Sequence, residues 1–301
     1  MPMSTPIRPY LQIHLCVLLW GFTAILGKLI SLPAGALVFW RMAIVAGVLA
    51  LAPRVWRALR ATPPRTLLAW AGIGVVVALH WLTFYGAIKL ANASVAATCM
   101  ALGAVFVALI EPLLGHRRRE PRELLLGLAV VTGVALVVGG ISPAMRVGFA
   151  VGVLSAALTA LFTVLNKRHA TEADPLAVTG VEIGAGCLFL ALVLPWWMGA
   201  DAVFQAPDAR DAGLLLALAL ACTILPFALS LLVMRHLPAF AVQLALNLEP
   251  VYAILLAIAL LGEQRELTPA FYLGVAIVLG AVFAQPLVLR RRVEPAELAP
   301  P

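Results

Sequence analysis

A carboxylate stands inside an apolar run near the end of the chain. Glu249 lies near the middle of the run from Phe240 to Leu261. An ionised carboxylate at the centre of a hydrocarbon layer costs roughly 2.5–3.5 kcal/mol on insertion scales, so such a side chain is expected to face a partner or a cavity. Glu249 could therefore bind the ammonium group of a solute or carry a proton. The alternative is a structural carboxyl that hydrogen-bonds to neighbouring helices beside a kink at Pro250.

His80 and Trp20 lie deep inside two other apolar runs. A neutral imidazole both donates and accepts hydrogen bonds, which suits a zwitterionic solute, although membrane histidines are also often structural. Phe84 follows His80 by one helical turn, so these two side chains share a face. Trp20 lies too deep for the aromatic belt at the membrane surface, and its indole offers a hydrogen-bond donor and a flat apolar face. We interpret all three as cavity-lining residues.

Two amides precede Glu249 in the same run. Gln243 and Asn247 are four residues apart and share one helical face, while Glu249 points about 200° away from Asn247. We expect the two amides to line the cavity, with helix packing as the alternative. Further candidates, for each of which ordinary packing or a kink is the favoured interpretation, are Met100, Phe162, Asn166, Pro226 and Phe227.

The elements that must hold these residues are membrane-spanning helices. Of the 301 residues, 63% are hydrophobic and 12% are charged, whereas soluble domains are about 45–50% apolar and about 25% charged. A spanning helix needs about 20 mostly apolar residues. Breaks at Pro, Gly and Arg clusters give ten such segments, near residues 11–30, 35–52, 66–89, 92–114, 122–140, 148–168, 176–198, 212–236, 238–261 and 268–289. The predicted fold class is an all-α membrane protein with ten transmembrane helices.

The net charge of +7 lies in short turns between the apolar segments. This placement indicates membrane topology and no nucleic-acid partner. If the N-terminus is cytoplasmic, fifteen Lys and Arg residues lie in inside segments: Arg8, Arg54, Arg57, Arg60, Arg65, Arg117, Arg118, Arg119, Arg122, Lys167, Arg168, Arg235, Arg290, Arg291 and Arg292. Five lie outside: Lys28, Lys89, Arg146, Arg210 and Arg265. The positive-inside rule therefore predicts two cytoplasmic termini on a multi-pass protein of the inner (plasma) membrane.

The chain also contains an internal repeat. LGLAVVTGVAL at 126–136 recurs as LGVAIVLGAVF at 273–283, a shift of 147 residues. Two copies of five spans must enter the membrane from opposite sides because five is odd. Inverted repeats in transporters enclose a midplane site that opens to either side in turn, and the alternative is a duplication that only built a larger bundle. We predict repeats over residues 10–145 and 146–289 and a basic, proline-rich cytoplasmic tail over 290–301.

Short motifs occur in a fixed order along the chain. They are LLWGFTAILGK (18–28), FWRMA (39–43), LEPV (248–251), LGE (261–263) and the glycine pairs Gly127/Gly133 and Gly274/Gly280. With the duplication, this order resembles the drug/metabolite transporter superfamily, specifically the ten-span EamA-type transporters and their amino-acid exporter branch. The resemblance implies a central cavity lined by spans 1, 3, 4, 6, 8 and 9, an outer scaffold of spans 5 and 10, and export of small metabolites.

The two copies differ at two places in this pattern. The first copy has GH at 115–116 where the second has GE at 262–263, and the sixth span has Thr159 near the place of Trp20. We therefore expect the copies to contribute unequally to the site.

Two further charges, Arg41 and Glu182, lie in corresponding spans of the two copies. Because the copies are inverted, we expect these side chains near opposite membrane faces, where each would snorkel or pair locally.

We expect an alternating-access exporter of small metabolites, chiefly amino acids with aromatic ones among the candidates, that works by facilitated diffusion. Its partners would be a small-molecule substrate and the lipid bilayer. No cofactor or metal is expected, because the four cysteines lie inside predicted helices without metal-type spacing. The sequence leaves the oligomeric state open, a monomer included.

Two alternatives remain. The first is a proton-coupled drug or metabolite antiporter in which Glu249 or His80 carries the proton. The second is an integral membrane enzyme, against which the sequence contains no HExxH motif, no GxSxG motif and no acidic metal cluster.

The inverted duplication predicts that both ends of the chain lie on one side of the membrane. Single cysteines introduced by Ser4→Cys and by Glu297→Cys into a cysteine-free background should both react with an impermeant maleimide from the cytoplasmic side only. Labelling of the two positions from different sides would contradict the inverted repeat.

Overall fold

The computed structural model describes residues 7–114, 121–169, 173–233, 236–237 and 245–288, and every regular element within them is helical. The first copy contains α1 (Ile7–Leu29), α2 (Ala34–Ala50), α3 (Pro53–Ala61), α4 (Pro64–Leu90), α5 (Ala93–Ala101), α6 (Gly103–Leu114) and α7 (Pro121–Gly139). After η1 (Pro143–Met145), the second contains α8 (Arg146–His169), α9 (Pro175–Met198), α10 (Ala200–Phe204), α11 (Ala209–Leu216), η2 (Ala217–Ile224), α12 (Leu225–Val233), α14 (Glu249–Leu256), η3 (Ala257–Leu261), η4 (Glu263–Arg265) and α15 (Pro269–Val288). The all-helical prediction is confirmed for these residues.

Five helical runs in the described part of the chain are long and apolar enough to cross a membrane. They are α1, α4, Ala93–Glu111, Pro143–His169 and α9. A sixth would be α2 together with α3, although this pair is bent by 84°. Shorter apolar helices lie in α7, in α14 with η3, and in α15. The structure thus supports five or six apolar spans, and ten crossings stay a prediction.

Capping residues fix where two of the central helices begin. Asp174 accepts a hydrogen bond from the backbone N–H of Leu176 at 2.9 Å, and Pro175 is the first residue of α9. Asn92 likewise accepts one from the N–H of Val95 at 2.9 Å before α5. A capping oxygen satisfies an N–H that has no partner within the helix, and proline at the first helical position loses no hydrogen bond. The start of each helix is therefore set locally by sequence.

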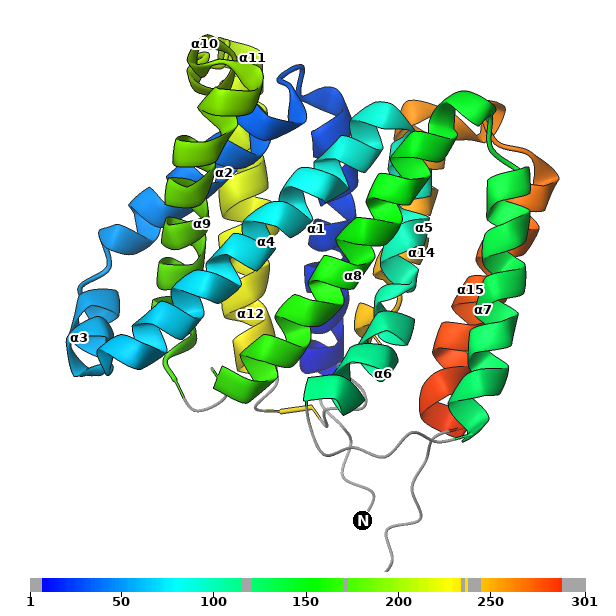
Figure 1. Ribbon diagram of the computed structural model, residues 1–301, viewed down its shortest axis with the longest axis horizontal. Coiled ribbons are helices and arrows are strands. Elements are labelled where there is room, and N and C mark those ends of the chain that lie inside the picture. The colour runs from blue at the N-terminus through cyan, green and yellow to red at the C-terminus, as the bar shows by residue number, and fades with distance from the viewer. Residues whose placement is uncertain (1–6, 115–120, 170–172, 234–235, 238–244, 289–301) are drawn as a thin grey trace, which may run out of the picture.

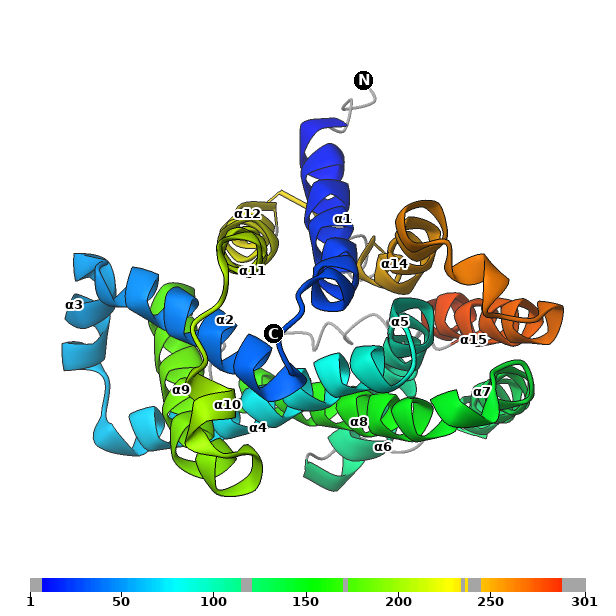
Figure 2. The same ribbon diagram turned by 90° about the horizontal axis from the view of Figure 1, so that it is seen from above.

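Corresponding helices of the two copies run in opposite directions. In Figure 1, α1 and α7 rise from the lower end of the molecule, whereas α8 and α15 descend towards it. Figure 2 shows α7 and α15 together at one end, away from α2 and α9. Their backbones approach closely because a Cβ on Gly133 would lie 2.9 Å from the carbonyl oxygen of Gly274. Small residues permit such an approach between membrane helices.

Two buried carboxylates tie loops together at the upper end of the molecule. Glu263 accepts hydrogen bonds from the backbone N–H groups of Ala93 (2.9 Å) and Ser94 (2.8 Å) at the start of α5. Asp211 accepts hydrogen bonds from the N–H (3.0 Å) and the hydroxyl (2.6 Å) of Ser31. Burial acts to raise the pKa of Asp211, but these bonds hold that pKa below its ordinary value. Both loops before α2 and α5 are thus held by the second copy.

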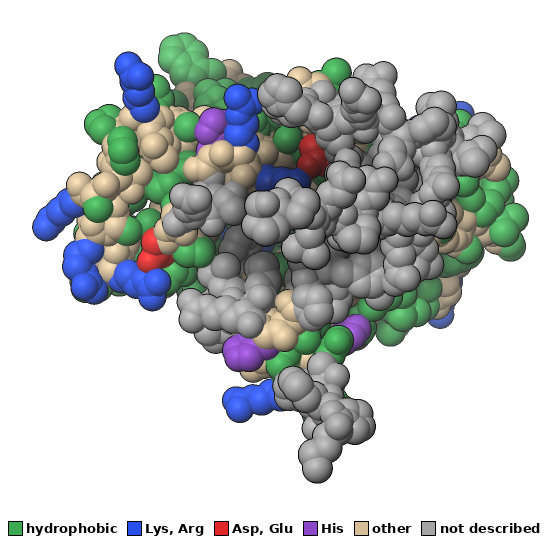
Figure 3. Space-filling view, turned by 90° about the horizontal axis from the view of Figure 1, so that it is seen from below, with side chains coloured by type: hydrophobic (Ala, Val, Ile, Leu, Met, Phe, Trp, Pro, Cys, Tyr) green, Lys and Arg blue, Asp and Glu red, His purple; other side chains and the backbone are tan. Residues whose placement is uncertain are grey.

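The lower end, where α1 begins and α15 ends, carries many basic side chains. Figure 3 shows Lys and Arg side chains on this face over α3. Arg54, Arg57, Arg60 and Arg65 are exposed there, and Trp56 is 50% exposed. Arginines together with an exposed tryptophan on a short helix are typical of an element that lies along a membrane surface. A cytoplasmic lower end agrees with this distribution and stays a prediction.

Replacing Glu263 should loosen the upper end. In Glu263→Gln one backbone N–H faces an amide NH₂ group instead of a carboxylate oxygen, and a buried unsatisfied donor costs about 1–3 kcal/mol. We expect a lower midpoint of thermal unfolding in detergent. Glu266→Gln is the matched control, because Glu266 is exposed and accepts a side-chain bond from Asn92 instead of backbone bonds. Equal midpoints for both variants would contradict the role of Glu263.

Candidate functional site

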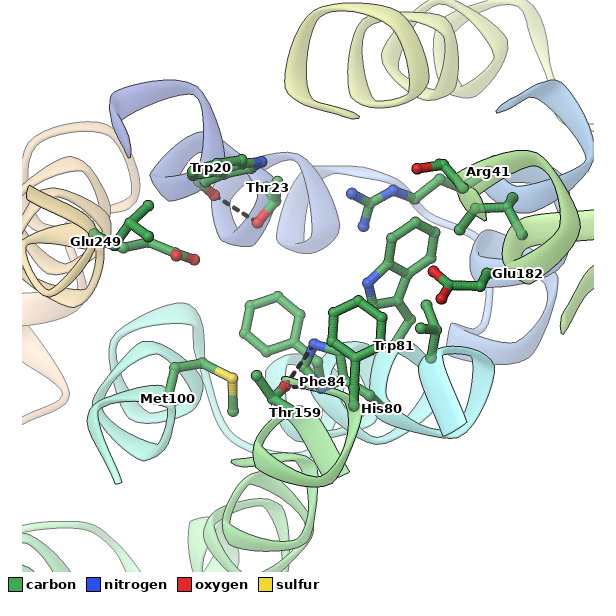
Figure 4. Close-up of a pocket in the computed structure, with 15 residues that line it drawn as sticks. Trp20, Thr23, Arg41, His80, Trp81, Phe84, Met100, Thr159, Glu182 and Glu249 are labelled. Atoms are coloured by element: carbon green, nitrogen blue, oxygen red, sulfur yellow. Dashed lines mark hydrogen bonds between the residues drawn. The ribbon is translucent and has the colours of Figure 1, made fainter. Parts of the chain in front are cut away.

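A cavity of about 280 Å³ lies between the two copies. Figure 4 shows its lining side chains, which come from α1, α2, α4 and α5 of the first copy and from α8, α9 and α14, with the residues before it, of the second. They are Trp20, Thr23, Arg41, Val77, His80, Trp81, Phe84, Met100, Thr159, Phe162, Thr179, Glu182, Ile183, Leu246 and Glu249. This volume lies just below the range of about 300–1,000 Å³ for ligand pockets, which is the size expected for a small metabolite.

Arg41 is the cation of this cavity. Its side chain is buried, with 4% of its surface exposed, and its guanidinium carbon lies 3.7 Å from the ring centroid of Trp81. It donates hydrogen bonds to the hydroxyl oxygen of Tyr85 at 2.7 Å and to that of Thr223 at 2.9 and 3.2 Å. These bonds use three of the five N–H donors of a guanidinium group. The described residues leave two N–H donors for a ligand.

The neighbours of Arg41 are positioned by special features of α1 and η2. Tyr85 packs under Gly27, where an added Cβ would lie 2.4 Å from the tyrosine ring. Thr223 lies in the π-helical segment η2 and donates its hydroxyl to the carbonyl oxygen of Leu218, five residues earlier, at 2.8 Å. Such π-helical segments occur frequently at functional sites. The guanidinium is therefore held by α2, α4 and η2 together.

Glu182 brings a carboxylate to the same side of the cavity. It is 5% exposed, and its side chain hydrogen-bonds to Asn166. Among the described residues, its buried Oε1 atom has no hydrogen-bond partner. Close packing of α4 on α9 sets its position, because a Cβ on Gly74 would lie 2.1 Å from the Glu182 carbonyl oxygen. A Cβ on Gly186 would similarly lie 2.6 Å from the Gly74 carbonyl oxygen. A buried carboxylate oxygen without a partner is costly, and a donor group of a ligand in the cavity would satisfy it.

Glu249 lies across the cavity from Arg41 and Glu182, at the start of α14 (Figure 4). Its side chain is half-buried and also lines two smaller pockets next to Met100 and Pro250. The described residues give its carboxylate no hydrogen bond and no ion pair. Its carboxylate thus faces the cavity, as expected for a charge inside a membrane.

His80 is fixed by the second copy. Its Nδ1 atom lies 2.8 Å from the Ser155 hydroxyl and 3.1 Å from the Ser155 carbonyl oxygen, and its Nε2 atom lies 3.0 Å from the Thr159 hydroxyl. Phe84 packs near its ring, with centroids 6.2 Å apart. The imidazole therefore bridges α4 and α8 while it faces the cavity, so structural and ligand-binding roles coincide at this residue.

The structure brings together most of the residues singled out from sequence. Trp20, His80, Phe84, Met100, Phe162 and Glu249 line the cavity. Asn166 hydrogen-bonds to Glu182, and Asn247 lines a smaller pocket with Met100 and Glu249. Pro226 is buried and its carbonyl oxygen accepts from Cys16. Gln243 and the side chain of Phe227 lie outside the described residues.

The expectation for Arg41 and Glu182 is wrong. Both line the cavity instead of lying near opposite membrane faces. Each follows its helix-starting proline by seven or eight residues, which at about 1.5 Å per residue is about 10–12 Å into a core roughly 30 Å thick. From this depth, long side chains reach the midplane from either side. Opposite helix directions therefore do not keep Arg41 and Glu182 apart.

Two related expectations also need correction. Arg41 and Glu182 bring ionisable groups to the cavity, whereas Glu249 is the only Asp, Glu, Lys or Arg among the cavity candidates named from the sequence. Helices α2 and α9, the second and seventh predicted spans, line it in addition to the expected set. No described side chain of α11, η2 or α12 lines it directly, and η2 acts through the bond from Arg41 to Thr223.

The fold and this cavity define a multi-pass membrane protein of the transporter class. The model of the EamA-like transporter family matches the chain twice, over residues 7–139 and 146–284. The chain belongs to the EamA-like transporter family, whose members lie in the drug/metabolite transporter superfamily and are transporters, not enzymes.

A solved crystal structure of another protein supports the same fold. It aligns with a TM-score of 0.61 over 96% of this chain and 99% of the other chain, at 19% sequence identity. A comparison with curated proteins gave no match.

The contact of α4 with α9 should tolerate no methyl group at Gly74. In Gly74→Ala the Cβ would overlap the Glu182 carbonyl, so the helices must separate, and we expect a loss of stability of about 1–3 kcal/mol, as for other overpacked cores. Gly72→Ala is the control on the same helix, because nothing lies within 4 Å of a Cβ there. Thermal unfolding in detergent checks both variants. An unchanged midpoint for Gly74→Ala would show that the helices are not in this contact.

Proposed function

We propose that the protein is an alternating-access transporter with ten spans that exports small metabolites, chiefly amino acids, across the inner membrane. The observation that carries this proposal is the central cavity, which is enclosed by both copies and holds Arg41, Glu182 and Glu249. Transporters with inverted repeats bind their substrates at such an interface near the midplane, and exchange of the two copies' conformations opens it to either side. Family membership supports transport of a small molecule.

The composition of the cavity supports amino acids as substrates. A zwitterion needs a cationic and an anionic partner, and Arg41 and Glu182 offer both on one wall. Four aromatic side chains, Trp20, Trp81, Phe84 and Phe162, provide flat apolar surface for a substrate side chain. Aromatic amino acids are therefore among the proposed substrates.

Facilitated diffusion is the proposed mode, and proton-coupled antiport is the second candidate. The observation that favours the second is that two carboxylates and His80 share one cavity, since ionisable residues inside membranes often form proton relays. The basic side chains at the lower end support a cytoplasmic position for both termini.

Counterflow into liposomes that contain the pure protein tests this proposal. Vesicles loaded with an unlabelled amino acid should take up the labelled form, because a carrier exchanges its substrate across the membrane. Trp20→Ala and His80→Ala should lower the initial rate by about tenfold or less, as for loss of one or two hydrogen bonds or stacking contacts. Leu68→Ala, at a lipid-facing residue that is 75% exposed on α4, should leave the rate unchanged.

The outcomes of this assay separate the candidates. Accumulation driven by an imposed pH gradient would identify proton coupling, whereas facilitated diffusion gives equal final concentrations. Absence of counterflow for every amino acid, with monodisperse protein, would contradict the proposal.

A further inference from the structure

The charges in the cavity do not balance. Arg41 supplies one positive charge, while Glu182 and Glu249 supply two carboxylates. With both carboxylates counted as ionised and histidine as neutral, as in the formal charge of the chain, the lining has one excess negative charge. A substrate with one excess positive charge would neutralise it. A charge without a partner inside a membrane is costly, so a substrate of opposite charge stabilises the substrate-bound protein.

The three charges are arranged on two opposite walls. Figure 4 shows Arg41 and Glu182 on the same side of the cavity, next to Trp81, while Glu249 projects from the other side. Arg41 and Glu182 form no ion pair with each other within 4.0 Å, and Arg41 is stacked on the indole of Trp81 at 3.7 Å. Each charge is therefore available to a different group of one ligand.

Each charge also has unused bonding capacity. The guanidinium of Arg41 has two N–H donors left, which can bind a carboxylate. In the part of the chain that the structure describes, the buried Oε1 atom of Glu182 and the carboxylate of Glu249 have no hydrogen-bond partner. A carboxylate and an ammonium group on one carbon match the wall of Arg41 and Glu182, and a second ammonium group matches Glu249.

The space between the walls is apolar. Trp20 and Phe84 line it together with the thioether of Met100 (Figure 4). A straight aliphatic chain packs well against such surfaces, as the stems of lysine side chains do in proteins. The cavity thus offers polar contacts at two ends and apolar contacts between them.

We propose that the preferred substrate is a dibasic amino acid of the lysine type, with its α-carboxylate on Arg41, its α-ammonium on Glu182 and its side-chain ammonium on Glu249. This inference rests on the proposed transport function and names the substrate class of the same cavity. A substrate without the side-chain ammonium would leave Glu249 without a cationic partner. Loss of the α-carboxylate leaves Arg41 unpaired.

Three labelled compounds in the counterflow assay test the assignment. L-Lysine is compared with L-norleucine, which has the same chain length without the side-chain ammonium, and with cadaverine, which lacks the carboxylate. Because a hydrogen bond to a charged group contributes more than a neutral one, we expect the lysine rate to exceed each of the other two rates by at least about tenfold at low concentration.

Glu249→Gln tests whether Glu249 binds the side-chain ammonium of the substrate. We expect the ratio of lysine to norleucine counterflow to fall at least about fivefold in this near-isosteric variant, with size-exclusion chromatography confirming a folded protein. Glu111→Gln is the matched control, since Glu111 pairs with Lys167 at 2.6 Å near the lower end of the bundle. Its ratio should equal that of the unmodified protein.

The remaining results overturn the inference. Norleucine or cadaverine rates equal to the lysine rate would show that the three charges do not select a dibasic amino acid. An unchanged ratio of lysine to norleucine counterflow in Glu249→Gln would show the same. Counterflow of neutral amino acids without lysine would overturn this inference and leave the proposed function in place. Absence of counterflow for all amino acids would overturn both.

Discussion

The structure depends on one constraint, that a charge inside the hydrocarbon layer must face protein or water. Arg41 satisfies it by stacking on Trp81 and by donating to Tyr85 and Thr223. This arrangement holds a long, flexible side chain in one place, with no acidic partner among the residues that the structure describes. Its positive charge is therefore left for the cavity, and the carboxylates of Glu182 and Glu249 face the same space for the same reason.

Close helix contacts make this arrangement possible. Gly74 and Gly186 bring α4 against α9, and Gly27 accommodates Tyr85 between α1 and α4. Without a hydrophobic force between helices in lipid, such packing and interhelical hydrogen bonds hold the bundle together. The glycines therefore determine where the charges lie, although none of them contacts the cavity.

The two copies share a fold but contribute different kinds of side chain to the cavity. The first provides Arg41, His80 and most of the aromatic surface, while the second provides both carboxylates. Thr159, near the place of Trp20 in the second copy, bonds to His80 instead of repeating an indole. At the upper end, Asp211 and Glu263 of the second copy hold loops of the first. Because the two copies contribute different side chains, the two ends of the cavity differ. Recognition of an asymmetric solute requires such a difference.

The sequence by itself determined the helical class, the duplication and the family, because apolar length, turn residues and repeated motifs are local or periodic signals. It also identified Trp20, His80, Phe84 and Glu249, since polar and aromatic groups deep in apolar runs are costly unless they face a cavity. Only the tertiary structure decided that Arg41 and Glu182 share that cavity. Their meeting depends on how α2, α4 and α9 cross, and a crossing is set by glycine contacts between distant segments, which no pattern within one helix records.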